Sequence, residues 1–533
     1  MDDGFRGRAP GARLATVVVL AFVAFAAIQA FQIRIRFYDT YDYLNDARAI
    51  LGDDGPGAAY YRVHAPVMPL VATLGALAHD PSDPANRWTW LVPHALAFLW
   101  VLLTLAALAA YLGRRHGRGP PWNGFWIWGL ALFVATPLFV RYSPHLLVDI
   151  PTAGAVAASL WLWDRVRVDR QWRWPILLGI AWGVAMGLKY SLLLFPGVFA
   201  VAAVLETIVD RKLFTGRNAR VALAGATGLA TFFGLVSFVY SHGTPEGFSF
   251  EQWVADLREA SSMVRPMEGD GPWDNVVMLG QVLSPVALVL AAIGLPAALH
   301  RWRRDLPAVL WLAFFVAMLS LGVGHSEARY LYPVFPVVMH LAVLGLRTLW
   351  GWRRATPERR AKAQRALRVV LPVSLLAASV PGVAQMVTDR DPFFRRPTHQ
   401  RVARLIVDAL PDDGKVHYSG HFVVLTPPNK VTYERDEFFD FFHFGHPAIH
   451  FLTRRQVLGS RVGRPELALR RERSAAAFIV GPSRFHHATD YLAGHELPTT
   501  FEVWIRTADG TIESHGFPSA DPGPPMPAEV SDP

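Results

Sequence analysis

Three aspartates with helical spacing form the first group of residues that could do chemistry. Asp39, Asp42 and Asp46 stand at positions i, i+3 and i+7 just after an apolar stretch, so a helix there carries all three carboxylates on one face. Like charges this close repel, and the arrangement invites a cation, a metal ion or a substrate to relieve them. A carboxylate in such a place can act as a general base. The alternative is a solvated helix face without a catalytic role.

A second group combines cations and acids from three later segments. Lys189 and Arg329 could hold a phosphate, Arg as a planar fork and Lys as a point charge, and His325 could donate to the same phosphate or exchange a proton. Glu327 is expected to pair with Arg329 and orient it. Asp149, near the end of an apolar stretch, is costly in lipid and should face protein or water. The alternatives are headgroup contact for Lys189 and a structural ion pair for Asp149.

The segments between these groups have the composition of a membrane protein. Of the 533 residues, 52% are hydrophobic and the mean hydropathy is +0.24, more apolar than a soluble protein of ordinary composition. Stretches long enough to cross a hydrocarbon core recur along the chain. We expect about eleven spans, at residues 14–33, 88–112, 124–140, 146–163, 174–190, 191–209, 219–241, 276–299, 307–324, 330–350 and 369–387. Pro66–Ala78 is too short to span and should lie partly embedded or re-enter the membrane edge.

Basic residues concentrate in every second connection between these stretches. They lie in residues 6–13, 114–118, 165–173, 211–220, 301–304 and 353–368. Cationic loops stay in the cytoplasm, so the N-terminus is expected inside and the C-terminal part outside, with the acids and cations described above. The same loops account for the net charge of +9 without any nucleic-acid partner. The first stretch lacks a small-residue cleavage site and is expected to be an uncleaved anchor.

The polar remainder is expected to form two long outer loops and a C-terminal domain. The loops are residues 34–87 and 242–275, and in the second an i, i+3, i+4, i+7 stripe over 250–264 predicts a helix that either lies flat in the interface or packs on the spans. Residues 388–518 are expected to form a small outer α/β domain. Its expected elements are a helix at 398–410, strands at 415–419 and 476–480, and a loop and helix at 481–492. The Pro-rich residues 519–533 should be disordered.

The residues available for metal binding are few. The chain has no cysteine, which excludes disulfides, thiolate metal sites and cysteine nucleophiles. His443, His446 and His450 have helical spacing, but Pro447 interrupts that helix and no tetrahedral ligand set accompanies them. No metal site is therefore expected among them, and no cofactor is required, although a divalent metal ion remains compatible with the acids of the first loop.

The first loop resembles the GT-C superfamily of polytopic glycosyltransferases, which includes protein O-mannosyltransferases and lipid A aminoarabinose transferases. The family pattern is an Asp-Glu pair after the first span, followed by a Tyr and an Ala at helical spacing. Asp39, Tyr43 and Ala47 match this pattern, whereas Thr40 stands in the place of the Glu. Asp39 is therefore the best match to the family acid, with Asp42 as its rival.

Three further stretches are similar to the same family. His145-Leu-Leu-Val-Asp149-Ile-Pro151 resembles its second outer motif, and Gly183-Val-Ala-Met-Gly187-Leu-Lys189-Tyr190 resembles its Gly-rich span ending in Lys-Tyr. His325-Ser-Glu327-Ala-Arg329-Tyr330 resembles its His-x-Glu-x-Arg-aromatic pattern before a late span. The resemblance covers about residues 14–350, and it rests on the order, spacing and common sidedness of the motifs.

The resemblance implies an all-α polytopic membrane protein of the GT-C type, with about eleven transmembrane helices, in the plasma (inner) membrane. It also implies an inverting transfer of one sugar from a polyprenyl-phosphate donor to a hydroxyl of a lipid, glycan or protein acceptor on the outer face. The implied roles fall into three sets: the base is Asp39 or Asp42; the phosphate contacts are Lys189, Arg329 and His325; and the supporting residues are Asp149, Glu327, Tyr190, Tyr330 and His64.

Two other functions compete with this interpretation. A transporter or flippase of lipid-linked saccharides would place ionisable residues and broken helices at mid-membrane depth, whereas here the ionisable residues stand at span ends. A non-catalytic membrane scaffold would not need acids and cations to converge. The sequence leaves the sugar, the acceptor, the carrier length and the oligomeric state open.

Overall fold

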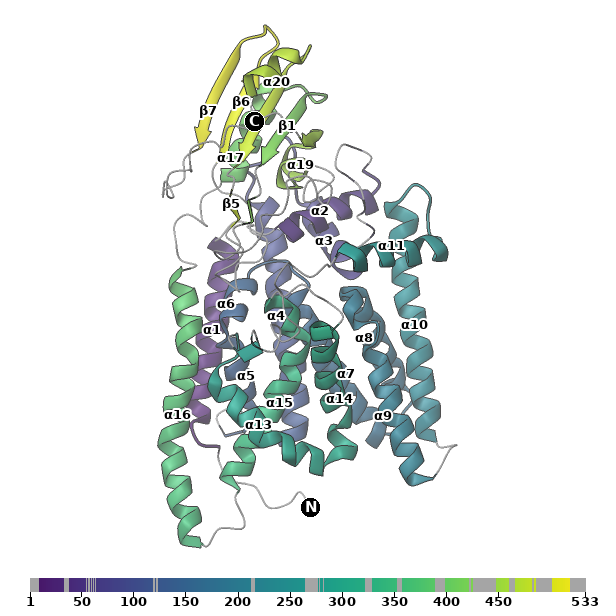
Figure 1. Cartoon of the computed structure of the whole chain (residues 1–533), viewed down its shortest axis with the longest axis vertical. Helices are drawn as coiled ribbons and strands as arrows, with labels where there is room; N and C mark the ends of the chain where they lie inside the picture. Colours follow the sequence, from purple (N-terminus) through teal and green to yellow (C-terminus); the bar gives the residue numbers. More distant parts are fainter. Residues whose placement is uncertain are drawn as a thin grey trace.

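The computed structural model has a long helical part with a small α/β domain at one end (Figure 1). It describes residues 9–32, 38–53, 55, 58, 60, 62, 64–117, 120, 123–211, 216–263, 277, 279–280, 282–321, 328–351, 357–388, 398–420, 423–424, 447–459, 465–481, 484–485 and 501–517. We call the end that carries the α/β domain the domain end, and the opposite end of the helical part the far end. The expected tail at 519–533 lies outside the described residues.

The helical part contains both long and short helices. Its longer helices are α1 (Ala12–Gln32), α4 (Trp88–His116), α7 (Asp149–Val168), α8 (Arg173–Leu188), α9 (Phe195–Asp210), α10 (Gly216–Gly243), α13 (Pro285–His300), α14 (Trp302–Leu321), α15 (Phe335–Trp350) and α16 (Pro357–Thr388). The shorter ones are α2 (Tyr38–Ile50), α3 (Val67–Leu77), α5 (Trp126–Val134), α6 (Pro137–Tyr142), α11 (Phe250–Met263) and the 3₁₀ helices η1 (Tyr190–Leu192) and η2 (Ala328–Val334).

Six helical stretches in the described part of the chain are long and apolar enough to cross a membrane. They are Ala12–Gln32, Trp88–His116, Tyr190–Asp210, Gly216–Gly243, Arg329–Trp350 and Gln364–Ala384. Every span expected from the sequence overlaps a described helix. Large apolar side chains such as Leu20 (63% exposed), Leu103 (50%) and Val204 (56%) face outward. An apolar exterior of this kind suits lipid rather than water, so the chain is an integral membrane protein.

Close helix packing accounts for several glycines of the helical part. Helices α13 and α15 lie so close that a Cβ atom at Gly345 would sit 1.9 Å from the carbonyl oxygen of Leu290. In α8, a Cβ at Gly183 would sit 2.5 Å from the side chain of Thr231 in α10. Small residues let transmembrane helices approach in this way, which gives the Gly-rich motif before Lys189 a packing role.

Three spans differ from the sequence expectation in their ends. The expected span 124–140 is two helices, α5 and α6, because Pro137 offers no N–H to continue the first and the Thr136 side chain caps the second by accepting from Phe139 N at 3.2 Å. The expected span 276–299 is interrupted at Leu283 and Ser284, and α13 begins at Pro285, where Ser284 accepts from Ala287 N at 3.1 Å. Helix α16 begins at Pro357, inside the basic segment expected to be a loop.

The outer-loop helices pack on the ends of the spans. In Figure 1, α11 runs across the bundle beside the domain end of α10. Trp253 of α11 is only 7% exposed, and its ring centre lies 5.4 Å from that of Phe233 in α10. The hydroxyl of Tyr240 donates to Asp256 at 2.9 Å. Of the two interpretations of this helix, the structure supports packing on the spans.

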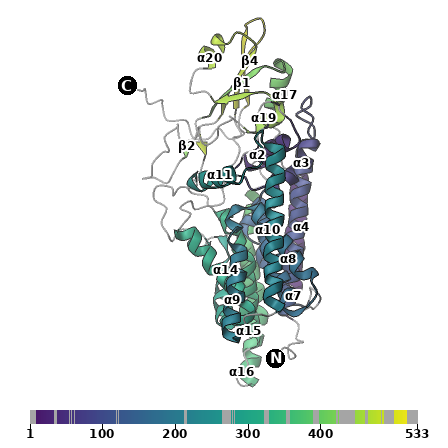
Figure 2. The same ribbon diagram turned by 90° about the vertical axis from the view of Figure 1, so that its right-hand side faces the viewer.

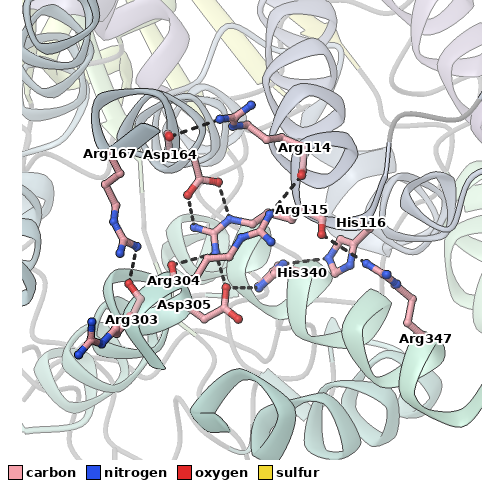
Figure 3. A network of polar contacts seen from close by, with 10 residues as sticks. All are labelled: Arg114, Arg115, His116, Asp164, Arg167, Arg303, Arg304, Asp305, His340 and Arg347. Atoms are coloured by element: carbon pink, nitrogen blue, oxygen red, sulfur yellow. Dashed lines mark hydrogen bonds and ion pairs between the residues drawn. The ribbon is translucent and has the colours of Figure 1, made fainter. Parts of the chain in front are cut away.

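A buried polar network ties four helices together at the far end (Figure 3). Arg115 of α4 donates through two nitrogens to Asp164 of α7, at 2.5 and 2.7 Å, and also contacts Asp305 of α14. His340 of α15 contacts Asp305 at 3.2 Å and His116 of α4 at 2.9 Å. These contacts bring the basic loops around 114–118, 165–173 and 301–304 to the same end of the molecule.

The C-terminal domain is a five-stranded mixed sheet with helices. Its helices are α17 (Thr398–Ala409), α19 (Pro447–Thr453) and α20 (Pro465–Arg471), and its strands are β1 (Lys415–Gly420), β2 (Val423–Val424), β3 (Val457–Gly459), β4 (Ala476–Gly481), β5 (Arg484–Phe485), β6 (Phe501–Arg506) and β7 (Ile512–Phe517). The sheet order is β3-β1-β4-β6-β7, with β1 parallel to β3 and β4 and the last three strands antiparallel. The expected helix at 398–410 and strands at 415–419 and 476–480 are present.

Helix α19 seats this domain on α2, where Figures 1 and 2 both show the two helices close together. The ring of Phe451 lies 5.8 Å from that of Tyr41 in α2 and 4.5 Å from that of His79 just after α3. Burial lowers the pKa of His450 to about 4, so this histidine is neutral at physiological pH. His443 and His446, the other members of the expected His triplet, lie outside the described residues.

Candidate active site

Helix α2 positions the three aspartates and is itself held firmly. Tyr41, Leu44 and Ala47 are completely buried in a cluster with α3, and full burial of a leucine side chain such as that of Leu44 contributes about 1.5–3 kcal/mol. The hydroxyl of Thr40 donates to the carbonyl of Leu146 at 3.1 Å, in the segment that leads into α7. Thr40, the departure from the family pattern, therefore anchors the aspartate-bearing helix to the next outer motif.

Asp39 forms an ion pair with Arg329, which lies 290 positions later in the sequence. The distance from Arg329 Nη1 to Asp39 Oδ2 is 2.5 Å. The arginine side chain is 7% exposed and the aspartate side chain 23%. Among the described residues Arg329 pairs with Asp39, and its expected pairing with Glu327 stays a prediction. Glu327 and His325 both lie outside the described residues.

A second ion pair stands beside the first. Helix α8 ends at Leu188, and Lys189 adopts an extended backbone conformation (φ −153°). Its Nζ lies 3.5 Å from Oδ1 of Asp149 at the start of α7. The same Nζ lies 4.2 Å from the ring centre of Tyr330, and the guanidinium carbon of Arg329 lies 5.7 Å from that ring. Two cations and two carboxylates from four elements thus meet around one aromatic ring.

Asp42 has different surroundings from Asp39. Its half-buried carboxylate makes no hydrogen bond or ion pair with the residues that the structure describes. Burial raises the pKa of Asp42 to about 8; nearby His64 lowers it, and the carboxylates of Asp39 and Asp46 raise it further. At neutral pH this carboxyl therefore carries its proton most of the time.

His64 completes the cluster through Asp46. Its Nδ1 lies 2.6 Å from Oδ2 of Asp46. Burial lowers the pKa of His64, but Asp46, Asp42 and Asp39 together raise it above its usual value. The hydroxyls of Tyr60 and Tyr190 donate to the His64 carbonyl at 2.6 and 3.2 Å. Tyr190, expected to support the site, thus fixes the backbone of His64.

The structure brings most of the expected residues into one region of the domain end. Asp39, Asp149, Lys189, Arg329 and Tyr330 are linked directly by the contacts above, and Asp42 and His64 stand next to them. Lys189 faces Asp149 rather than standing alone at the headgroups, which is the structural ion pair considered for Asp149. No group of three or more His, Asp and Glu side chains in the described part of the chain is arranged to hold a metal ion.

Sequence reasoning missed two residues that support this site. Asp46 was recognised as part of the acidic face but not as the partner of His64. Arg48, whose side chain is 2% exposed, joins α2 to Asp53 at 2.8 Å and lies 3.5 Å from the carbonyl of His450 in α19. The helical spacing of Asp46 was visible in the sequence, but the contact with α19 joins residues 402 positions apart, which no local pattern reveals.

Comparison with protein families gives a partial match inside this region. Residues 64–238 match the family model described as dolichyl-phosphate-mannose-protein mannosyltransferase. The matched segment contains His64, Asp149 and Lys189, and it ends before Arg329. Among curated proteins, no sequence matches this chain significantly.

Solved structures share the fold over most of the chain. The crystal structure of ArnT from Cupriavidus metallidurans bound to undecaprenyl phosphate is similar with a TM-score of 0.55 and 14% identity, covering 88% of this chain and 92% of that one. The apo oligosaccharyltransferase of Archaeoglobus fulgidus is similar with a TM-score of 0.50 and 12% identity, covering 85% of this chain and 65% of that one. The chain therefore shares the fold of these polytopic membrane proteins, and its residues 64–238 match the mannosyltransferase family model.

Proposed function

We propose that the protein transfers a sugar from a polyprenyl-phosphate donor to a hydroxyl of an acceptor at the domain end of its helical part. The observation that carries this proposal is the meeting of the Asp39–Arg329 and Lys189–Asp149 pairs around Tyr330. Such a transfer requires a carboxylate that accepts the proton of the acceptor hydroxyl and cations that bind the phosphate. The undecaprenyl phosphate bound to the similar ArnT structure supports a lipid phosphate as the donor's leaving group.

The reaction is a single displacement. The acceptor oxygen attacks the anomeric carbon, the bond from that carbon to the phosphate oxygen breaks, and the proton of the acceptor hydroxyl passes to a carboxylate of α2. The configuration of the anomeric carbon is inverted. Negative charge grows on the departing phosphate, so Lys189 and Arg329 stabilise the transition state more than the ground state.

The two carboxylates of α2 suit different parts of this step. Asp39 stands in direct contact with the phosphate-binding cation and matches the family acid. Asp42, with its pKa raised to about 8, is a proton donor at neutral pH, suited to hydrogen-bond a sugar or acceptor oxygen. We assign the base role to Asp39, with Asp42 as the alternative that mutagenesis must exclude.

Membrane sidedness follows from the loops. The arginines of the far end belong to the cytoplasmic face by the positive-inside rule, and the site belongs to the opposite, extracytoplasmic face. A donor carried on a polyprenyl chain is available there, whereas a soluble nucleotide sugar is not. The transporter alternative is less well supported, because the ion pairs lie at the ends of helices rather than at a mid-membrane break.

The test is donor turnover by the purified protein. It is incubated with a panel of radiolabelled polyprenyl-phosphate sugars, and release of polyprenyl phosphate is measured for the wild type and for Asp39→Asn. We expect one donor to be consumed by the wild type, with a rate about 10²–10⁴-fold lower for the variant, as for loss of a positioned base. The proposal fails if no member of the panel is consumed, or if Asp39→Asn and Asp42→Asn both keep the wild-type rate.

A further inference from the structure

Arg329 and Asp39 are joined by a contact that a donor phosphate would compete for. A guanidinium fork recognises carboxylates and phosphates by the same geometry. One of its donors, Nη1, is held by the Asp39 carboxylate at 2.5 Å. The side chain of Arg329 is 7% exposed and that of Asp39 is 23% exposed, so the aspartate is the more accessible member of the pair.

We propose that Arg329 changes partner in each catalytic cycle: it holds Asp39 while the donor site is empty, and it moves to the donor phosphate when the donor binds. The exchange releases the Asp39 carboxylate, which then takes the proton of the acceptor hydroxyl. This inference rests on the proposed function and adds an order to it, because the base becomes available only after the donor has bound.

The two ion pairs differ in how easily they can open. Asp149 is 1% exposed, and separating it from Lys189 would leave a buried carboxylate without its cation, which is strongly unfavourable. Asp39 is 23% exposed, so its carboxylate can be solvated or meet an acceptor hydroxyl after Arg329 leaves. The Asp39–Arg329 pair is therefore the one that opens, and the Lys189–Asp149 pair stays closed and holds the Lys189 ammonium group in place.

The paired state of Asp39 is unsuited to catalysis. A cation in contact with a carboxylate favours the ionised form and so weakens it as a proton acceptor. When Arg329 turns to the phosphate, it leaves the carboxylate and meets the group on which negative charge will develop. This movement of Arg329 makes Asp39 a stronger base and places the guanidinium group beside the departing phosphate.

The local structure permits a small movement of Arg329. It lies in η2, a 3₁₀ helix, whose hydrogen bonds have poorer geometry than those of an α-helix. Tyr330, the next residue, faces Lys189 at 4.2 Å and Arg329 at 5.7 Å. The ring keeps both cations near one point, so that a phosphate entering beside Lys189 lies within reach of Arg329.

The inference is tested by equilibrium binding of radiolabelled undecaprenyl phosphate, which carries no sugar, to the purified full-length protein. Removing the competing carboxylate should raise the fraction of binding-competent Arg329, so Asp39→Asn should bind the lipid phosphate about tenfold more tightly than the wild type. Asp39→Glu keeps the charge and should bind like the wild type. The matched control is Asp408→Asn, because Asp408 also pairs with an arginine, Arg404, but is exposed on the C-terminal domain; its affinity should not change.

A double-mutant cycle separates exchange from simple removal of negative charge. In an Arg329→Ala background the Asp39 carboxylate no longer competes with the lipid phosphate for the guanidinium group. Asp39→Asn should therefore no longer improve the binding of undecaprenyl phosphate. The exchange is overturned if Asp39→Asn binds undecaprenyl phosphate as tightly as the wild type or more weakly, or if it gains affinity equally in both backgrounds. If the wild-type protein still turns over donor, each of these results leaves the proposed function intact. If the wild type neither binds undecaprenyl phosphate nor consumes any labelled donor, the proposed function fails and the exchange fails with it.

Discussion

At the residue scale, neighbours decide what otherwise equal carboxylates can do. Asp39 and Asp42 are one helical turn apart on α2, yet the first lies against a guanidinium and the second lies in a half-buried place between two other acids. Burial therefore acts on Asp42 with little compensation and raises its pKa to about 8. One helix face thus supplies a paired carboxylate and a protonated one.

The raised pKa of Asp42 predicts a pH dependence. Below about pH 8 the carboxyl is protonated and neutral; as the pH rises through this value it becomes a further negative charge in the candidate site, near the cations proposed to bind the donor phosphate. Donor kcat/KM of the wild type should therefore fall at alkaline pH, and Asp42→Asn should remove this fall. Donor kinetics between about pH 6.5 and pH 9.5, on either side of that value, would test this. A wild-type rate that instead rises with the ionisation of Asp42, and is lost in Asp42→Asn, would make Asp42 the base.

The Lys189–Asp149 pair predicts separate effects on binding and stability. Lys189→Ala should weaken donor use by about 1.5–3 kcal/mol, the range for a hydrogen bond to a charged group. It should also destabilise the protein, because Asp149 is 1% exposed and would lose its ion pair with Lys189. Adding Asp149→Asn should restore much of the thermal stability but not the donor affinity. If the double variant recovers both, Lys189 acts only as a structural partner.

The sequence could predict which residues converge but not how they pair. The spacing of the three aspartates and the position of Lys189 and Arg329 at span ends were enough to bring them to one region. The pairing of Asp39 with Arg329 joins residues 290 positions apart and depends on how η2 docks against α2. The local pattern pointed only to the neighbouring Glu327, whose pairing with Arg329 stays a prediction.

At the element scale, charged residues lock the helices that the apolar pattern predicts. Arg115 is 1% exposed and contacts Asp164 and Asp305, which are 7% and 2% exposed, so α4, α7 and α14 share one buried cation (Figure 3). Arg304 and Arg347 add donors to the carbonyls of Arg114 and Arg115 at the end of α4. Cations are favourable at this end of a helix because of its dipole.

Loss of this shared cation should be costly. Arg115→Met removes the charge while keeping an apolar side chain, and it takes away the cation that the two buried carboxylates share. We expect a loss of about 3–5 kcal/mol in stability, measured as a lower thermal unfolding temperature in detergent. Arg404→Met is the matched control, because both acids that pair with Arg404 are exposed and such pairs contribute about 0–1 kcal/mol. Equal effects of the two substitutions would contradict a structural role for the network.

Element boundaries could be predicted less well than the elements themselves. Each apolar stretch picked out by its length overlaps a described helix, but the break at Thr136 depends on a Pro without an N–H and on a capping hydroxyl. Strand β4 is a buried apolar run, and β1 alternates buried Val416 and Tyr418 with the more exposed Lys415 and His417. Strand β6 alternates buried Val503 and Ile505 with more exposed neighbours, a readable period of two, whereas β3, with three residues, is too short for any period to be seen.

At the scale of the whole molecule, the C-terminal domain and the membrane part meet at the aspartate-bearing helix. Phe451 and Leu452 of α19 are fully buried in the same cluster as Tyr41 and Leu44 of α2. Arg48 reaches from α2 to the backbone of α19. The C-terminal domain therefore helps to support the candidate site. The two ends of the molecule differ, because the domain end carries the candidate site and the C-terminal domain, and the far end carries the network around Arg115.

This asymmetry predicts how the molecule is oriented in a membrane. Positively charged loops are retained in the cytoplasm, so the far end should face the cytoplasm and the C-terminal domain the outside. The chain has no cysteine, so single cysteines can report sidedness without background. Glu513→Cys lies on the exposed strand β7 and Arg301→Cys on the exposed turn between α13 and α14. In intact cells or spheroplasts, a membrane-impermeant thiol reagent should label the first variant, and the second only after permeabilisation. Labelling of both from one side would refute the orientation, and with it the extracytoplasmic position of the site.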